Sequence, residues 1–173
     1  MISIRLATED DLPGILSIYN DIILHTTAVY DYQPHSMEMR KTWWASKVKD
    51  KYPVFVAAEA EKIVGFSSIG PFRAWAAYKY SVENSVYVAT EHRGRGIGKI
   101  LLPPLITAAI ERNLHVIIAG IDASNEASLQ LHRHFGFREV AHFREVGYKF
   151  GRWLDLKFLE LILNTPSNPS EFE

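Results

Sequence analysis

Residues 83–112 read ENSVYVATEHRGRGIGKILLPPLITAAIER, and this stretch decides the fold class of the chain. A strand-like run over residues 85–89 leads into a turn that contains Gly94, Gly96 and Gly98, and an apolar, helix-like run follows. Glycines let backbone N–H groups converge on an oxygen without a side chain in the way. The start of a helix adds the positive end of a dipole. Strand, glycine turn and helix together predict a site that cradles a phosphate group.

The helix in this stretch contains Pro103 and Pro104 where its second turn should lie. Each proline removes a backbone donor, and a proline inside a helix costs about 3 kcal/mol. Either the helix is kinked, which leaves the carbonyls of Lys99 and Ile100 free, or it starts only at the prolines. We expect the kinked helix.

Composition narrows the class of protein. The 173 residues are 47% hydrophobic and 23% charged, as in an ordinary soluble domain with its own core. The formal net charge of −1 gives no global electrostatic case for a nucleic-acid partner. No cysteine is present, which excludes disulfides, thiolate catalysis and cysteine-based zinc sites. No signal peptide or membrane-length apolar run is evident, so we expect a cytoplasmic protein without a membrane partner.

Seven histidines raise the question of a metal site. None fits an HExxH pattern, and His132 and His134 would point apart on a helix. We therefore expect no metal.

Hydrophobic periodicity orders the remaining elements. Strands are predicted over residues 2–6, 53–58, 63–69, 115–121, 137–143 and 152–163. One helix is predicted to start at residue 12, a second to span residues 36–49, and a short one to end at residue 134. A turn is predicted over 146–151, and the proline- and serine-rich tail over 164–173 is expected to be disordered. The order β-α-α-β-β-β-α-β-α-β-β predicts one α/β layer with a mixed sheet.

Two motifs carry a resemblance to a known family. Arg93-x-x-Gly96-x-Gly98 after a strand resembles the pyrophosphate motif of the GNAT superfamily of N-acetyltransferases, and Asn125-x-x-Ser128 with the run to Phe137 resembles its second cofactor segment. Residues 82–88, 148–155 and 18–20 resemble the phosphinothricin and methionine-sulfoximine N-acetyltransferase branch. The resemblance implies a single GNAT-like α/β (α+β) domain over residues 1–163, with a mostly antiparallel central sheet flanked by about four helices.

The resemblance also implies acetyl-CoA as co-substrate. Backbone groups of the strand before the turn would pair with its pantetheine arm, and the turn would wrap the pyrophosphate. Arg95 and His134 could equally be solvated, and Asn125 could be a plain N-cap. The implied cofactor-binding residues are Val86, Tyr87, Val88, Arg93, Gly94, Arg95, Gly96, Ile97, Gly98, Lys99, Asn125, Ser128 and His134.

Acetyl transfer to an amine needs a base, because an ammonium group must first lose a proton. Glu83, at the start of the strand, aligns with the acid taken as base in the resembling branch. A backbone N–H, that of Val88, could meet the developing oxyanion. His132 could donate a proton to the leaving thiolate, or it could be a structural histidine.

Substrate selection is predicted in the aromatic segment before Glu83. The resemblance places Arg73, Ala74 and Trp75 at the substrate, and a guanidinium fork suits a carboxylate or phosphinate. Arg73 could instead be a surface arginine that stacks on an aromatic ring. The aromatic-rich loop over residues 25–32 could wall a substrate pocket or pack as a lid onto the core. Tyr30, Tyr32, Tyr78, Tyr80, Lys149 and Trp153 are weaker pocket candidates.

The sequence thus predicts an N-acetyltransferase for a small amino-acid-like amine. Other open readings are acetylation of a polyamine or a protein N-terminus, a non-catalytic CoA-binding module, and nucleotide binding by the same glycine turn. The second motif argues against the nucleotide reading. A homodimer is expected, because dimers are common in the resembling branch.

Overall fold

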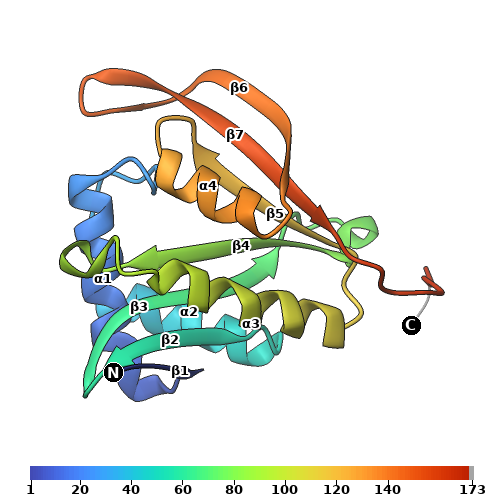
Figure 1. The fold of residues 1–173 in the computed structure, drawn as a ribbon, viewed down its shortest axis with the longest axis horizontal. Helices are drawn as coiled ribbons and strands as arrows, with labels where there is room; N and C mark the ends of the chain where they lie inside the picture. The colour runs from blue at the N-terminus through green and yellow to red at the C-terminus, as the bar shows by residue number, and fades with distance from the viewer. Residues whose placement is uncertain (172–173) are drawn as a thin grey trace.

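Alternating apolar residues at the start of the chain form one edge of a seven-stranded sheet (Figure 1). The computed structural model describes residues 1–171. The strands are β1 (Ile2–Leu6), β2 (Val54–Glu59), β3 (Lys62–Pro71), β4 (Ser81–Val88), β5 (Val116–Asp122), β6 (Arg138–Lys149) and β7 (Arg152–Ile162). Their spatial order is β1-β2-β3-β4-β5-β7-β6, and only β4 and β5 pair in parallel. The predicted mixed, mostly antiparallel sheet is confirmed.

Four α-helices lie within the described residues and cover both faces of the sheet (Figure 1). These are α1 (Leu12–His25), α2 (Met37–Lys49), α3 (Ile97–Glu111) and α4 (Glu126–His134). The predicted order of helices and strands is confirmed. Local caps explain two of the starts: Ser36 accepts from the Met39 N–H, and Asn125 accepts from the Ser128 N–H.

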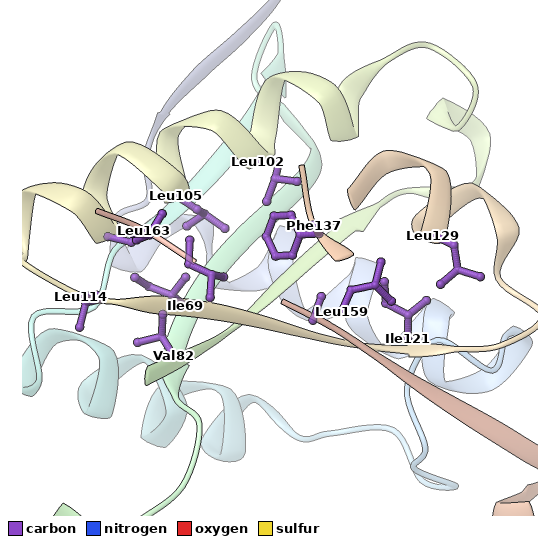
Figure 2. Close-up of a cluster of buried hydrophobic side chains, with 13 residues drawn as sticks. Ile69, Val82, Leu102, Leu105, Leu114, Ile121, Leu129, Phe137, Leu159 and Leu163 are labelled. Atoms are coloured by element: carbon purple, nitrogen blue, oxygen red, sulfur yellow. The ribbon is translucent and has the colours of Figure 1, made fainter. Parts of the chain in front are cut away.

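Two apolar layers hold the helices on the sheet. On one face, Ile15 and Ile22 of α1 pack in a cluster with Phe66 of β3. On the other face, Leu102 and Leu105 of α3 share a larger cluster with side chains of β5, α4 and β7 (Figure 2). Burying such a side chain fully contributes about 1.5–3 kcal/mol. The sheet is therefore packed between α1 and α2 on one face and α3 and α4 on the other.

The prolines do not set the start of α3. The helix begins at Ile97 and continues through Pro103 and Pro104 to Glu111. The expectation of one helix that includes the prolines is confirmed, and the reading in which it starts at the prolines is wrong. Strong packing explains the tolerance, because Leu101, Leu102 and Leu105 on either side of the prolines are fully buried.

The C-terminal hairpin differs from the sequence prediction. The predicted turn over 146–151 is wrong, because β6 runs to Lys149 and the turn consists of Phe150 and Gly151. An irregular register between Phe143 and Gly147 interrupts the alternation of side chains, so the pattern reads as a strand end. After β7, Thr165 donates to the Leu114 carbonyl. No helix or strand occurs over residues 164–171. The disorder predicted for the tail over 164–173 stays a prediction, and residues 172–173 lie outside the described part of the chain.

Candidate active site

The parallel strands β4 and β5 separate in the middle of the sheet. They pair from Ser81 to Glu83, opposite Val116 to Ile118, and then diverge. A cleft of about 1090 Å³ opens there, and residues 86–88 of β4 and 119–122 of β5 line it. Backbone groups in such a gap can pair with an extended ligand as they would with another strand.

The hydrogen bonds around β4 show which of its backbone groups face the cleft. Ala89 donates to Val64 of β3, and Ser81 accepts from Phe72 on the same side. Because backbone groups alternate between the two edges of a strand, Val86 and Val88 present theirs to the cleft. The backbone of Tyr87 faces β3 and is not free to pair with a ligand in the cleft, although Tyr87 is among the residues that line it.

The glycine turn forms one end of the cleft. Gly94 and Gly96 have φ of 74° and 78°, a left-handed conformation that favours glycine. No side chain caps the start of α3, and a Cβ added at either glycine would meet no atom within 4 Å. The first amides of α3 can therefore meet an anion. The predicted residues Arg93, Gly94, Gly96, Ile97, Gly98 and Lys99 all line the cleft.

Arg95 does not line the cleft with the rest of the turn. Its guanidinium donates to both carboxylate oxygens of Glu59, at 2.7 and 3.1 Å. This exposed ion pair holds the pKa of Glu59 at about 2. The geometry fits the interpretation in which Arg95 is a solvated surface side chain rather than a cofactor contact. The Lys99 N–H is also engaged, because it donates to the Gly96 carbonyl.

The start of α4 forms the opposite wall. Asn125, Ser128, His132 and His134 all line the cleft. The Asn125 side chain caps the helix, so its role as an N-cap and a contact to a ligand are compatible. The two segments predicted as cofactor motifs, about thirty residues apart in the chain, thus face one space.

Glu83 lies where β4 and β5 part. Its carboxylate packs against Gly120, whose N–H is close enough to lower the pKa of Glu83, and Gly120 itself lines the cleft. Partial burial raises the pKa of Glu83, while Arg73 and the Gly120 N–H lower it in part. Glu83 is therefore a carboxylate of raised basicity beside the cleft.

His132 is enclosed by the protein. Its side chain is 3% exposed, its Nδ1 lies 2.8 Å from the Ser128 carbonyl oxygen, and its Nε2 lies 2.9 Å from the Asn84 amide nitrogen. Because a carbonyl only accepts, Nδ1 carries the hydrogen and Nε2 accepts from Asn84. Burial lowers the pKa of His132, which disfavours the charged form of the ring. This geometry fits a structural histidine better than a proton donor.

The predicted substrate segment lies outside the cleft walls. Arg73 donates to the Phe72 carbonyl, and its guanidinium carbon stacks 4.1 Å from the centre of the Phe72 ring. Its positive charge nevertheless lowers the pKa of Glu83. Ala74 and Trp75 follow it, and Trp75 is 73% exposed. Of these three residues, only Arg73 acts on Glu83, because its positive charge lowers the pKa of the carboxylate.

A family model described as an acetyltransferase (GNAT) domain matches residues 4–157. This chain belongs to the GNAT acetyltransferase family. It is 43% identical over 163 residues to an L-methionine sulfoximine/L-methionine sulfone acetyltransferase from Pseudomonas aeruginosa, a match that covers 94% of this chain and 95% of that protein.

Two solved structures of GNAT-like proteins place the fold. A ribosomal-protein-alanine N-acetyltransferase from Brucella melitensis is 48% identical, with a TM-score of 0.91 over 93% of this chain and 99% of that one. A phosphinothricin acetyltransferase from Sinorhizobium meliloti, solved in complex with acetyl-CoA, is 32% identical, with a TM-score of 0.93 over 97% of this chain and 92% of that one. The predicted family and fold are confirmed.

In this GNAT chain, the cleft has a further wall that the sequence predicted only in part. Residues 26–28, Asp122, Phe150 and Arg152 line it, and Asn84 fixes His132. Gly120 is the sequence feature that could have indicated this part of the cleft, because a glycine inside an apolar strand often marks the close approach of another group. Residues 26–28 have no regular secondary structure. They belong to the loop over residues 25–32, which the sequence allowed as a pocket wall or as a lid on the core, and they line the cleft. Among residues 1–171, no helix is long and apolar enough to cross a membrane, and no cluster of three metal-ligating side chains occurs.

Proposed function

We propose that this chain transfers the acetyl group of acetyl-CoA to the α-amino group of a small amino-acid-like acceptor of the methionine sulfoximine, methionine sulfone or phosphinothricin type. One observation carries the proposal: a single cleft joins the uncapped start of α3 to Gly120, against which the Glu83 carboxylate packs. An anion site and a base thus share one space. The names of the relatives support the acceptor class.

The residues present fit the co-substrate. The first amides of α3 and Arg93 suit a pyrophosphate, and the cleft-facing backbone of Val86 and Val88 suits the amide groups of an extended arm. Asn125 and Ser128 provide polar groups on the opposite wall. Bound there, acetyl-CoA supplies an activated acetyl group as a thioester.

Glu83 is then the general base. Its carboxylate takes a proton from the acceptor ammonium, directly or through one water, and the neutral amine attacks the thioester carbonyl. The Val88 N–H can donate to the carbonyl oxygen as negative charge develops there. The C–S bond breaks, and the thiolate of CoA leaves and takes up the second proton that the amine nitrogen loses as the amide forms. His132 as the acid that protonates this thiolate stays a prediction, and its enclosed N–H does not support it.

Arg73 is the proposed partner for an acidic group of the acceptor. It lies close enough to lower the pKa of Glu83, and its guanidinium can turn from the Phe72 carbonyl to a carboxylate. Ala74 and Trp75 remain proposed substrate contacts on the same exposed segment. We propose no nucleic-acid partner, consistent with the net charge of −1, and a cytoplasmic location, where acetyl-CoA is available.

A thiol-release assay with acetyl-CoA tests the function. Methionine sulfone, methionine sulfoximine and phosphinothricin are expected to release CoA, whereas a polyamine and an alanine-terminated peptide are expected to react far more slowly. Preference for the peptide would favour an activity like that named for the Brucella melitensis relative. Acetyl-CoA binding without transfer to any amine would favour a non-catalytic module.

Replacing Gly120 by alanine tests the placement of Glu83. The added Cβ would lie 2.9 Å from Glu83 Oε1, so the carboxylate must move away from the Gly120 N–H. We expect kcat to fall by about ten- to a hundredfold, since small misplacements of a catalytic group cost that much. Because that N–H lowers the pKa of Glu83, the acid limb of the pH–rate profile should move to higher pH. A fall in kcat with an unmoved limb would contradict this.

We also propose that β6 forms a homodimer interface with a second copy of the chain. β6 is a twelve-residue strand at the edge of the sheet. Apolar side chains of the β6–β7 hairpin are 46–60% exposed, namely Val140, Phe143, Val146, Tyr148 and Trp153. A long edge strand that exposes apolar side chains is usually covered, and the self-complementary patch of a twofold dimer would cover both edges.

Light scattering of charged variants tests the dimer. Val140→Glu with Val146→Glu should convert the protein to a monomer, because two charges would enter the interface. Val48→Glu is the matched control, since Val48 of α2 is 59% exposed but lies away from β6. A wild-type monomer at micromolar concentration would overturn the proposal.

A further inference from the structure

Lys149, the last residue of β6, is a buried cation without a carboxylate in hydrogen-bond contact in the described chain. Its side chain is 3% exposed. The ammonium donates to the carbonyl oxygens of Ile23 at 2.6 Å, Thr26 at 2.9 Å and Val29 at 2.8 Å. An ammonium has three N–H donors, so all of them are used. They hold the end of α1 and the segment that follows it.

These contacts join two walls of the cleft. Residues 26–28 line it from one side, and Phe150 and Arg152 line it from the hairpin. Phe150 and Gly151 have φ of 50° and 74°, the two left-handed residues of a tight hairpin turn. This turn directs Lys149 inward to α1 while Phe150, next along the chain, lines the cleft.

Two tyrosines reinforce the same junction. The Tyr30 hydroxyl donates to the Asp122 carboxylate at 2.9 Å, and the Tyr32 hydroxyl donates to the Tyr148 carbonyl at 2.6 Å. The Tyr30 ring also lies against Gly147, where an added Cβ would come within 2.8 Å of it. The segment that connects α1 to α2 is therefore shaped by the hairpin rather than by its own secondary structure.

The wall formed by residues 26–28 lies on the same face of the sheet as Glu83, the proposed base. Tyr87 packs edge-to-face on Tyr19 of α1, 5.5 Å between ring centres. Side chains alternate along a strand, so Glu83 shares that face with Tyr87. Asn84, on the other face, contacts His132 of α4. The segment after α1 thus borders the space from which an acceptor reaches Glu83, whereas α3 and α4 border the opposite face.

We propose that Lys149 is a positioning residue that fixes residues 26–29 as the acceptor-side wall of the cleft, and thereby sets the affinity for the acceptor rather than for acetyl-CoA. The inference rests on the proposed function for its kinetic consequence. Its structural part, that the ammonium orders this segment, stands on the three carbonyl contacts alone.

Lys149→Met removes the donors but keeps the length of the side chain. We expect the KM for methionine sulfone to rise at least tenfold, the KM for acetyl-CoA to stay within twofold, and amides 26–30 to exchange hydrogen faster. Lys149→Arg, which keeps a charge and donors, should recover part of the acceptor affinity. Lys41→Met, at an exposed position of α2, is the matched control and should change none of these values.

Gly147→Ala gives an independent test, because it displaces the Tyr30 ring without touching Lys149. It should reproduce the rise in KM for the acceptor. Unchanged acceptor KM in both variants, or an equal rise in both KM values, would overturn the inference. If Lys149→Met does not fold, Gly147→Ala and Lys149→Arg decide it. If the wild type acetylates no acceptor, the proposed function fails instead, and hydrogen exchange at residues 26–30 still decides whether Lys149 orders the segment.

Discussion

Glu83→Gln is expected to lower kcat for acetyl transfer by about 10²–10⁴-fold, the usual contribution of a positioned general base. The substitution keeps the size of the side chain and an oxygen atom beside the Gly120 N–H. It removes the group that accepts the proton of the ammonium. Binding of acetyl-CoA, measured as a thermal shift, should be unchanged, because the anion-binding end of the cleft lies at the start of α3.

The pH dependence separates loss of the base from general damage. Burial raises the pKa of Glu83, so the wild-type rate should fall as pH drops through a value above that of an ordinary glutamate. In Glu83→Gln this limb should disappear. The residual rate should instead follow the free amine and rise about tenfold per pH unit below the pKa of the acceptor. A variant that keeps the wild-type profile would show that another group is the base.

The same substitution has a predictable effect on stability. Because the pKa of Glu83 is raised in the folded state, folding favours its protonated form. Its favourable contribution is present at pH below the unfolded pKa and is lost as pH rises through the folded pKa. Urea unfolding should therefore find Glu83→Gln more stable than the wild type at pH 8, with the difference shrinking in acid. Greater wild-type stability at pH 8 would contradict the burial of the charge.

The contrast between Gly96 and Lys149 shows what the sequence could predict. Gly96 belongs to a local pattern of strand, glycine turn and helix, and neighbouring residues along the chain determine its conformation. Lys149 instead contacts carbonyls more than 100 residues earlier in the chain. No periodicity or turn signal encodes such a pairing, so the sequence offered it only as a weak pocket candidate.

His132 and Tyr87 show the same limit at finer scale. The motif placed both residues at the cleft, and both line it. Which of their atoms face the cleft depends on partners from other elements. The Asn84 amide of β4 donates to Nε2 of His132, and the backbone of Tyr87 pairs with β3. The local motif therefore predicted the location of the site better than the roles of its individual groups.

Gly98→Val should weaken acetyl-CoA binding most strongly of the changes at the glycine turn. Gly98 lies in the first turn of α3, where an added Cβ would come within 2.9 Å of Leu131 Cδ2 on α4. Its φ is not left-handed, so the effect is steric. Overpacking of this kind costs about 1–3 kcal/mol, and a shift of α3 away from Leu131 would move the amides that face the pyrophosphate. We expect the KM for acetyl-CoA to rise about tenfold, which corresponds to about 1.4 kcal/mol.

A second substitution tests whether the contact with Leu131 is the cause. Leu131→Ala removes both methyl groups near the new side chain, so the double variant should recover much of the acetyl-CoA affinity lost in Gly98→Val. Effects of residues in contact are non-additive in this way, whereas those of distant residues add. Glu111→Val, at an exposed position of the same helix, controls for the introduction of a β-branched residue into α3. If Gly98→Val instead raised the KM for the acceptor and left that for acetyl-CoA unchanged, the start of α3 would not be the site that holds the co-substrate.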